Sequence, residues 1–192
     1  YTPCFKGSRE PLFTKPKGRE MWVILLEKVF CKTYQSYTIS EGGFPEEAME
    51  TLHGCPGVRH RTDESLDEMW KHLVEADKNN FLMACGTRGD VDSKTGLHGG
   101  HAYTIISTHQ VQNYKLLKVR NPWGHGEWKG KFSDSSSIWN DSMKKAVNYV
   151  NSDDGCFFME LADFKKCFGH YDIAFYHDNF KYTYIEDRNE PH

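Results

Sequence analysis

The feature that most constrains the fold is a change in the spacing of apolar residues near residue 80. Before it, apolar side chains recur at the three- and four-residue intervals of helices with one buried face. After it, they lie in short runs rich in β-branched and aromatic residues. Because helices come first and hairpin-linked strands follow, the order predicts an α+β domain with antiparallel β-sheets and flanking helices, rather than alternating β-α-β units.

Three helices are expected in the first part of the chain. One runs from Met21 to about Tyr34, and a short one covers residues 46–52. Another begins after a cap at Thr62-Asp63, where short polar side chains accept the first backbone N–H groups. The side chains expected to face inward are Trp22, Leu25, Leu26, Val29 and Phe30 in the first helix, and Leu66, Met69, Trp70, Leu73 and Val74 in the last.

The second part of the chain predicts strands joined mostly by turns. A hairpin turn is expected at Gln112-Asn113, and a polar loop is expected over residues 124–141. A short helix is expected over residues 161–168. The predicted strands cover residues 81–85, 101–108, 114–120, 157–159 and 171–177.

Prolines and glycines at the start of the chain predict an extended lead-in over residues 1–18. Residues 181–192 are expected to form a polar tail or linker, which leaves residues 19–180 as one folded unit. We expect the lead-in to continue from an upstream segment of a longer polypeptide.

Composition excludes several classes of function. The net charge of −3 provides no basic patch for nucleic acid, and no apolar run approaches the roughly 18 residues of a transmembrane helix. The six cysteines include no CxxC pair, which argues against a zinc ribbon. Cys31 and Cys85 lie in apolar runs typical of buried thiols, and this favours a reduced, cytoplasmic protein.

The first candidate for chemistry is His101, which follows two glycines at the entry to a predicted strand. Glycines such as Gly100 allow another backbone, for example a substrate peptide, to approach closely. A histidine there could act as a general base near neutral pH, or it could be a half-exposed structural residue. His98 is a competing candidate, but it does not directly precede the strand.

The second candidate is Asn121, which lies one hairpin further along the chain. Pro122 restricts Asn121 to an extended conformation and so fixes the direction of its side chain. Its amide could accept an imidazole N–H and hold the ring in one tautomer without adding charge, which suits a thiolate–imidazolium pair. Trp123 could cover this hydrogen bond. A turn with a core tryptophan would explain the same residues.

Taken together, the Gly-His-Ala-Tyr stretch at 100–103 and the Arg-Asn-Pro-Trp-Gly-x-x-Glu-Trp stretch at 120–128 resemble the calpain family of papain-like cysteine proteases. The resemblance spans about residues 20–177. It includes Leu25-Leu26-Glu27-Lys28, the Ser-Asp-Ser-Ser-Ser-Ile-Trp stretch at 133–139, and Asp153-Asp154-Gly155 followed by Phe157-Phe158-Met159.

The resemblance implies that His101 and Asn121 are two members of a Cys-His-Asn triad, supported by Trp123. It also implies that Gly100 and Gly54 contact protein substrates, although the family's Gly-Gly pair appears here as Gly54-Cys55. The nucleophile of the family lies upstream, before a tryptophan and at the start of a helix. No cysteine in this chain has that setting. We therefore expect a preceding half of the core to supply it, and this chain alone to be inactive.

The resemblance further implies a calcium site in two acidic loops. Its ligands would be Glu127, Asp134 and Asp154, with backbone carbonyls near Ser152. A further acidic residue of the family is replaced by Cys156, and sulfur is a poor calcium ligand. A weakened site is therefore expected, with solvated loop acids as the alternative.

Two other functions remain open at this point. A calpain homologue without the upstream nucleophile would act as a binding or scaffold module. A transglutaminase-like acyltransferase would use the same catalytic chemistry, but such enzymes normally orient the histidine with aspartate, and Asn121 argues against this.

Overall fold

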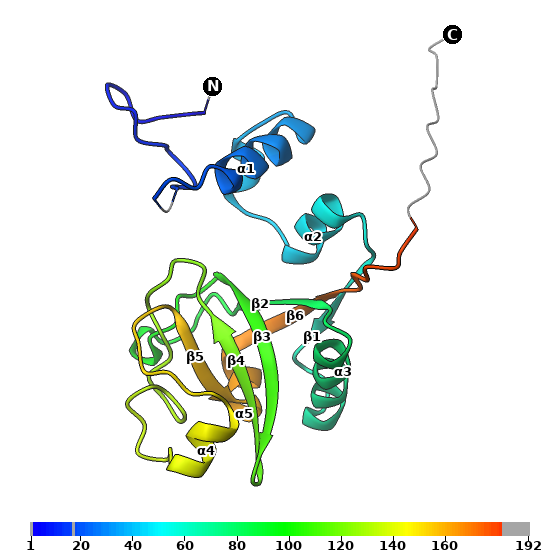
Figure 1. The fold of residues 1–192 in the computed structure, drawn as a ribbon, viewed down its shortest axis with the longest axis vertical. Helices are drawn as coiled ribbons and strands as arrows, with labels where there is room; N and C mark the ends of the chain where they lie inside the picture. Colours follow the sequence, from blue (N-terminus) through cyan, green and yellow to red (C-terminus); the bar gives the residue numbers. More distant parts are fainter. Residues whose placement is uncertain (1, 17, 182–192) are drawn as a thin grey trace.

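The computed structural model describes residues 2–16 and 18–181, and residues 182–192 of the expected tail lie outside this part. Figure 1 shows the order of the elements. The α-helices are α1 (Trp22–Thr33), α2 (Pro45–His53), α3 (Leu66–Lys78), α4 (Asp141–Ala146) and α5 (Leu161–Cys167). The 3-10 helices are η1 (Thr38–Glu41) and η2 (Ser93–Thr95). The strands are β1 (Gly57–Arg61), β2 (Leu82–Thr87), β3 (Ala102–Val111), β4 (Tyr114–Arg120), β5 (Cys156–Glu160) and β6 (Phe168–Ala174).

The strands form one six-stranded sheet in the order β1-β6-β2-β3-β4-β5, and every neighbouring pair is antiparallel. The predicted α+β class is confirmed. The hairpin turn between β3 and β4 lies at Gln112-Asn113 as expected, and Gln112 adopts a positive φ of 53° there. Among the described helices, none combines the length and the apolar character needed to cross a membrane.

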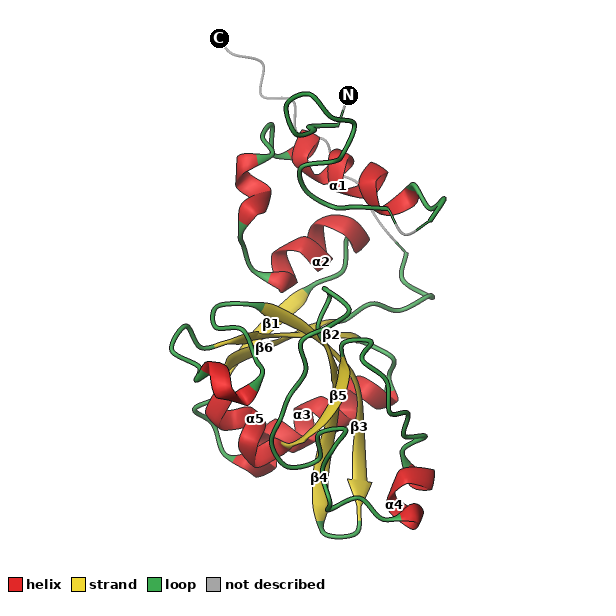
Figure 2. Cartoon of the chain, turned by 90° about the vertical axis from the view of Figure 1, so that its left-hand side faces the viewer, coloured by secondary structure: helices red, strands yellow, loops and turns green. Residues whose placement is uncertain are grey.

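Each face of the sheet carries its own core. Neighbouring residues of a strand point to opposite faces, so Leu117 packs in the core under α3 and α5, whereas Leu116 packs in the core beside α4. Figure 2 shows α3 and α5 on one side of the sheet and α4 on the other. The first core includes Leu73 and Tyr171, and both are fully buried.

Several boundaries differ from the sequence prediction. The cap of α3 is Ser65 rather than Thr62-Asp63: Ser65 Oγ accepts the N–H of Glu68, and the Glu68 carboxylate accepts the N–H of Ser65. Thr62 is buried, and its hydroxyl donates to the carbonyl of Phe168. The edge strand β1 and the short helix α4 were not predicted, and the last strand begins three residues earlier than expected.

The apolar face of α1 was predicted to be buried, and this prediction is wrong for most of its residues. Trp22 is 62% exposed, Leu25 56% and Val29 60%, whereas Ile24 and Cys31 are buried. Figures 1 and 2 both show α1 apart from the sheet. The face is exposed because the described part of the chain lays no element over it. Several neighbouring exposed apolar side chains on one helix face are typical of a contact with another folded unit.

Candidate active site

His101 lies immediately before β3, at the edge of the sheet where β2 ends. Its backbone N–H donates to Thr87 Oγ1 at 2.9 Å, and its carbonyl accepts the N–H of Thr87 at 3.0 Å. The preceding Gly100 has a φ of +65°, which a residue with a Cβ adopts only with strain. A Cβ on Gly99 would lie 2.5 Å from the carbonyl oxygen of Gly89. The two glycines therefore allow the tight bend that places His101 at the mouth of the strand.

Asn121 follows β4 directly and is fully buried. Its Nδ2 donates to the carbonyls of His125 at 2.8 Å and Gly126 at 3.1 Å, so Oδ1 must be the atom that faces His101. The distance from Oδ1 to Nε2 of His101 is 2.9 Å. Because Oδ1 can only accept, Nε2 carries the proton in this pair and Nδ1 keeps its lone pair.

The ring of His101 lies between two aromatic side chains. Its centroid is 4.2 Å from that of Trp123 and 4.9 Å from that of Tyr103. Oδ1 of Asn121 also accepts the N–H of Trp123 at 3.1 Å. The ring of His98 packs against Trp123 at 4.6 Å, but no hydrogen bond joins it to Asn121 within the described residues. The structure thus brings together His101, Asn121 and Trp123, and leaves His98 beside them.

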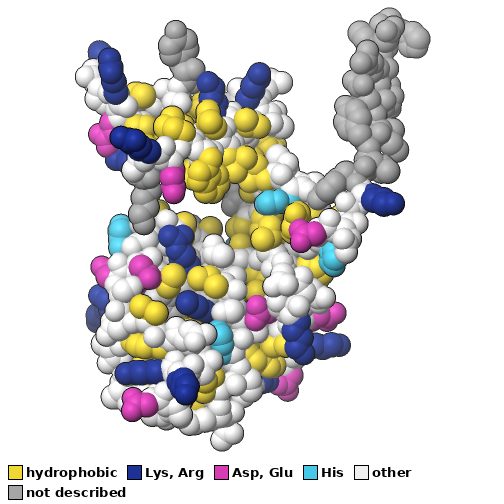
Figure 3. All heavy atoms as spheres, in the orientation of Figure 1, with side chains coloured by type: hydrophobic (Ala, Val, Ile, Leu, Met, Phe, Trp, Pro, Cys, Tyr) yellow, Lys and Arg dark blue, Asp and Glu magenta, His cyan; other side chains and the backbone are white. Residues whose placement is uncertain are grey.

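A cleft of about 710 Å³ opens next to His101. One wall comes from α1, η1 and the start of α2, and the other from the ends of β2, β3 and β6. Figure 3 shows this hollow between the upper part of the chain and the sheet. The lining residues are Phe30, Tyr34, Ser40–Gly43, Phe44, Pro45, Glu47, Ala48, Gly86, Thr87, Gly100, His101, Ala102 and His170.

Of the two glycines predicted to contact substrate, Gly100 lines the cleft and Gly54 does not. Gly54 has a φ of 63° and ends α2 as its C-cap, a position that favours glycine for conformational reasons. Gly42 and Gly43 line the cleft instead. Neither glycine was predicted from the sequence to line the cleft, although two adjacent glycines were a visible signal.

None of the six cysteines is placed as a nucleophile for His101. All six are free thiols, and among the hydrogen bonds of the described residues none joins a cysteine to His101. Burial raises the pKa of the thiols of Cys55, Cys85, Cys156 and Cys167, which is opposite to the activation that a catalytic cysteine requires.

The two acidic loops lie side by side and are connected by hydrogen bonds. Glu127 Oε1 accepts the N–H groups of Asp154 at 3.1 Å and Gly155 at 2.8 Å. Asp134 Oδ2 accepts the N–H of Ser152 at 3.2 Å, and the Ser152 hydroxyl donates to Asp154 Oδ2 at 2.8 Å. The carbonyl of Ser152, an expected calcium ligand, accepts the N–H of Asp154. Protein donors therefore satisfy these oxygens in the present arrangement.

The carboxylates are close enough to influence one another electrostatically. Burial raises the pKa of Glu127, and the neighbouring Asp134 raises it further. Burial likewise raises the pKa of Asp134, and Asp154 adds to the effect. The hydroxyl of Ser152 and the N–H of Cys156 lower the pKa of Asp154. A cation would relieve the repulsion, so the charges and oxygen ligands fit calcium in kind.

The distances between the carboxylate oxygens are longer than those in a calcium coordination shell. Across the part of the chain that the structure describes, Glu127, Asp134 and Asp154 do not bring one oxygen each to within 4.8 Å of one another. Calcium ligands lie about 2.3–2.6 Å from the ion, so the loops would have to contract around it.

The antiparallel sheet with flanking helices, and the histidine held by an asparagine beside a cleft, are compatible with part of a cysteine protease core. Comparison with known proteins agrees. The family model for calpain family cysteine proteases matches residues 1–175, and this chain belongs to that family.

Individual relatives support the same conclusion. The chain is 33% identical to calpain-type cysteine protease ADL1 of Oryza sativa subsp. japonica over 177 residues, which is 86% of this chain and 8% of that protein. It is 35% identical to calpain-9 of Mus musculus over 185 residues, or 90% of this chain and 27% of that protein. It is 32% identical to the calpain-1 catalytic subunit of Mus musculus over 82% of this chain and 24% of that protein. The chain thus spans about a quarter or less of these relatives.

Proposed function

We propose that this chain is the His/Asn-bearing half of the catalytic core of a cysteine endopeptidase that hydrolyses peptide bonds in protein substrates. The observation that carries the proposal is the 2.9 Å contact between His101 Nε2 and Asn121 Oδ1, with the amide fixed by two backbone carbonyls. This contact fixes the tautomer of the imidazole before any substrate arrives.

The proposed roles follow from that tautomer. Nδ1 of His101 accepts the proton of a cysteine thiol, which forms a thiolate–imidazolium pair. The thiolate attacks the substrate carbonyl, and His101 then donates the proton to the leaving amine. Asn121 holds the ring in orientation without adding a second negative charge, and Trp123 limits the access of water to the hydrogen bond.

We propose that the cysteine comes from a preceding half of the core. Two observations support this partner. The thiols whose pKa is shifted in this chain are shifted upward, away from the thiolate form. The apolar face of α1 and the 53% exposed Trp123 are surfaces that a second folded unit would cover. The six free thiols favour a reducing, cytoplasmic location.

We also propose that calcium binds the loops that carry Glu127, Asp134 and Asp154, with a carbonyl near Ser152. The repulsion of Glu127 by Asp134, and of Asp134 by Asp154, supports a site that a cation would stabilise. The thiol of Cys156 is hydrogen bonded to Asp154 and stands where an oxygen ligand would strengthen the site. Binding is therefore expected to be weaker than at a fully acidic site.

Peptide hydrolysis tests the catalytic proposal in two arms. The 192-residue chain alone, incubated with an unstructured peptide and calcium, is expected to show no activity, because it lacks an activated thiol. In the longer polypeptide that includes the upstream half, His101→Ala is expected to reduce kcat by a factor on the order of 10²–10⁴. His98→Ala, the matched control, is expected to cause a much smaller loss.

Activity of the chain alone that survives purification and disappears on alkylation would contradict the proposal. Equal losses of kcat in the two histidine variants would show that His101 is not the group that transfers the proton. If the longer polypeptide is itself inactive and lacks a cysteine before the upstream tryptophan, the protein is the scaffold-type homologue.

A further inference from the structure

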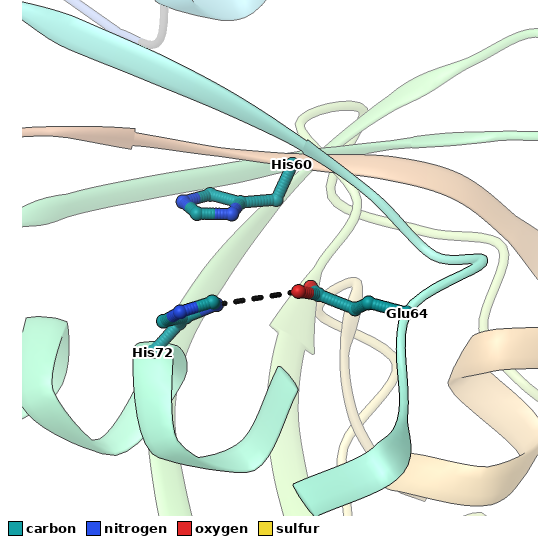
Figure 4. A group of neighbouring side chains, drawn as sticks. All are labelled: His60, Glu64 and His72. Atoms are coloured by element: carbon teal, nitrogen blue, oxygen red, sulfur yellow. Dashed lines mark ion pairs between the residues drawn. The ribbon is translucent and has the colours of Figure 1, made fainter. Parts of the chain in front are cut away.

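A second cluster of ligand-type side chains lies between β1 and α3 and shares no residue with the cleft lining. His60 comes from β1, Glu64 from the connection that follows it, and His72 from the second turn of α3. Figure 4 shows the two imidazole rings one above the other, with the carboxylate of Glu64 directed toward them. In the described chain this is the one group of three His, Cys, Asp or Glu side chains whose ligand atoms all lie within 4.8 Å of one another.

The fold holds these three residues from several directions. The capping box at Ser65 fixes the start of α3, and the buried hydroxyl of Thr62 anchors the connection to Phe168. The ring centroids of His60 and His72 are 4.5 Å apart at an interplanar angle of 35°. His72 Nδ1 lies 3.5 Å from Glu64 Oε2. The ligand atoms of the three side chains all lie within 4.8 Å of one another.

Tyr171 supports the cluster from the sheet. It is fully buried, pairs with His60 across β1 and β6, and stacks against that ring at 4.8 Å and 7°. Its hydroxyl donates to Glu64 Oε1 and lies 3.0 Å from His72 Nδ1. A buried group that orients both a carboxylate and an imidazole is the kind of support that metal ligands commonly have.

A pocket of about 290 Å³ adjoins the cluster, and His60 and His72 line it together with apolar side chains of β1, α3 and β6. The pocket leaves room for water or a small ligand as a fourth ligand.

The ligand types select the ion. Two imidazoles and one carboxylate form a ligand set that zinc adopts with an open fourth position. Calcium and magnesium instead require oxygen ligands throughout. We propose that His60, Glu64 and His72 bind a zinc-class divalent transition-metal ion, whose fourth coordination position faces the adjoining pocket. The ion would join the edge strand β1 to α3.

Zn²⁺ and Co²⁺ titrations of the 192-residue chain test the proposal. We expect one equivalent of Co²⁺ to give the visible bands of a four-coordinate ion and to be displaced by Zn²⁺. His60→Phe keeps the aromatic stack on Tyr171 but removes a ligand, and His72→Asn removes the other imidazole. Each is expected to weaken binding at least about tenfold. His109→Gln, a half-buried histidine on β3 bonded to Ser107, is the matched control and is expected to bind like the wild type.

Circular dichroism melts without metal establish whether each variant folds. If His60→Phe does not fold, Glu64→Gln provides the test of the metal site. Its amide oxygen can still accept a hydrogen bond from Tyr171, while the charged ligand is lost. Equal binding by the wild type and by the folded variants would locate the ion at thiols or other histidines and overturn the proposal. Absence of binding to the wild type would overturn it as well, and the cluster would then be a stacked aromatic and hydrogen-bonded network only.

Discussion

The cleft beside His101 lies between a helical wall, formed by α1, η1 and α2, and a sheet wall, formed by the ends of β2, β3 and β6. The sheet wall rests on two cores with fully buried side chains such as Leu73 and Leu116. The helical wall exposes most of the apolar face of α1. The sheet wall therefore rests on packing within this chain, whereas no described element covers most of the apolar face of α1 in the helical wall.

A matched pair of leucines gives the largest expected contrast between the walls. Leu73→Ala removes a fully buried side chain from the sheet core and is expected to reduce the free energy of unfolding by about 2–5 kcal/mol. Leu25→Ala removes a side chain that is 56% exposed on α1, and its effect is expected to stay within about 0.5 kcal/mol. Urea denaturation of the 192-residue chain measures both values.

The comparison fails if Leu25→Ala destabilises the chain as strongly as Leu73→Ala. That result would mean that the face of α1 is already covered in solution, for example by a second copy of the chain. A change in sedimentation behaviour with protein concentration would then identify the covering surface.

The sheet wall was also the easier one to predict from sequence. The hairpin turn at Gln112-Asn113 brings the start of β3 beside the end of β4, where Thr104 pairs with Arg120 after a one-residue shift in register. His101 and Asn121 therefore lie at the same end of the hairpin. Period-2 and β-branched patterns describe such strands because their side chains pack within this chain. The edge strand β1 escaped detection because it contains Arg59, His60 and Arg61, and charged residues are common on sheet edges.

The helical wall was harder for a different physical reason. The spacing of apolar residues shows that they lie on one face of α1, but it does not say which surface covers that face. The same limit applies to the cleft. Gly54 and the Gly42-Gly43 pair both lie in loop-like stretches of the sequence, and the three-dimensional path shows that Gly54 ends a helix while Gly42 and Gly43 line the cleft.

An ion-pair network connects the two walls. Arg59 on β1 bonds to Glu46 on α2 and donates from Nε to Asp172 Oδ1 on β6 at 2.9 Å. Asp172 is fully buried, its Oδ2 has no hydrogen-bond partner among the described residues, and His170 Nε2 lies 3.6 Å from that oxygen. Burial raises the pKa of Asp172 to about 6, although Arg59 acts against this.

The sign of the pH effect follows from that raised pKa. The folded state binds the proton of Asp172 more tightly than the unfolded state does, so this group stabilises the fold fully below about pH 4. Its contribution is lost as the pH rises through about 6. Asp172→Asn cannot titrate but can still accept from Arg59. The decrease in unfolding free energy between pH 4 and pH 7 is expected to be smaller in this variant, by on the order of 1–3 kcal/mol.

Thermal melts across this pH range measure the difference. Asp63→Asn, which removes a mostly exposed carboxylate from the segment after β1, is the matched control and is expected to keep the wild-type profile. If both variants keep that profile, the connection between the walls does not depend on the protonation of Asp172.

The smallest expected effect concerns the acidic loops that connect β4 and β5. The apolar residues of the sheet are buried within the chain, but the carboxylates of Glu127, Asp134 and Asp154 still repel one another. A ligand that binds only the folded state stabilises it by RT ln(1 + [L]/Kd), which is about 0.4 kcal/mol when the calcium concentration equals Kd. Because the proposed site has Cys156 where an oxygen ligand would strengthen it, we expect millimolar calcium to raise the melting temperature by only a few degrees.

Asp134→Ala is expected to abolish this shift, because its Oδ2 also holds the N–H of Ser152 and so connects the two loops. Asp141→Ala, which removes an acidic residue from the first turn of α4, is the matched control and is expected to retain it. An equal shift in the Asp134 variant would place the ion elsewhere. No shift in either protein would mean that the backbone donors already satisfy these carboxylates, and that the loops are stable without a bound cation.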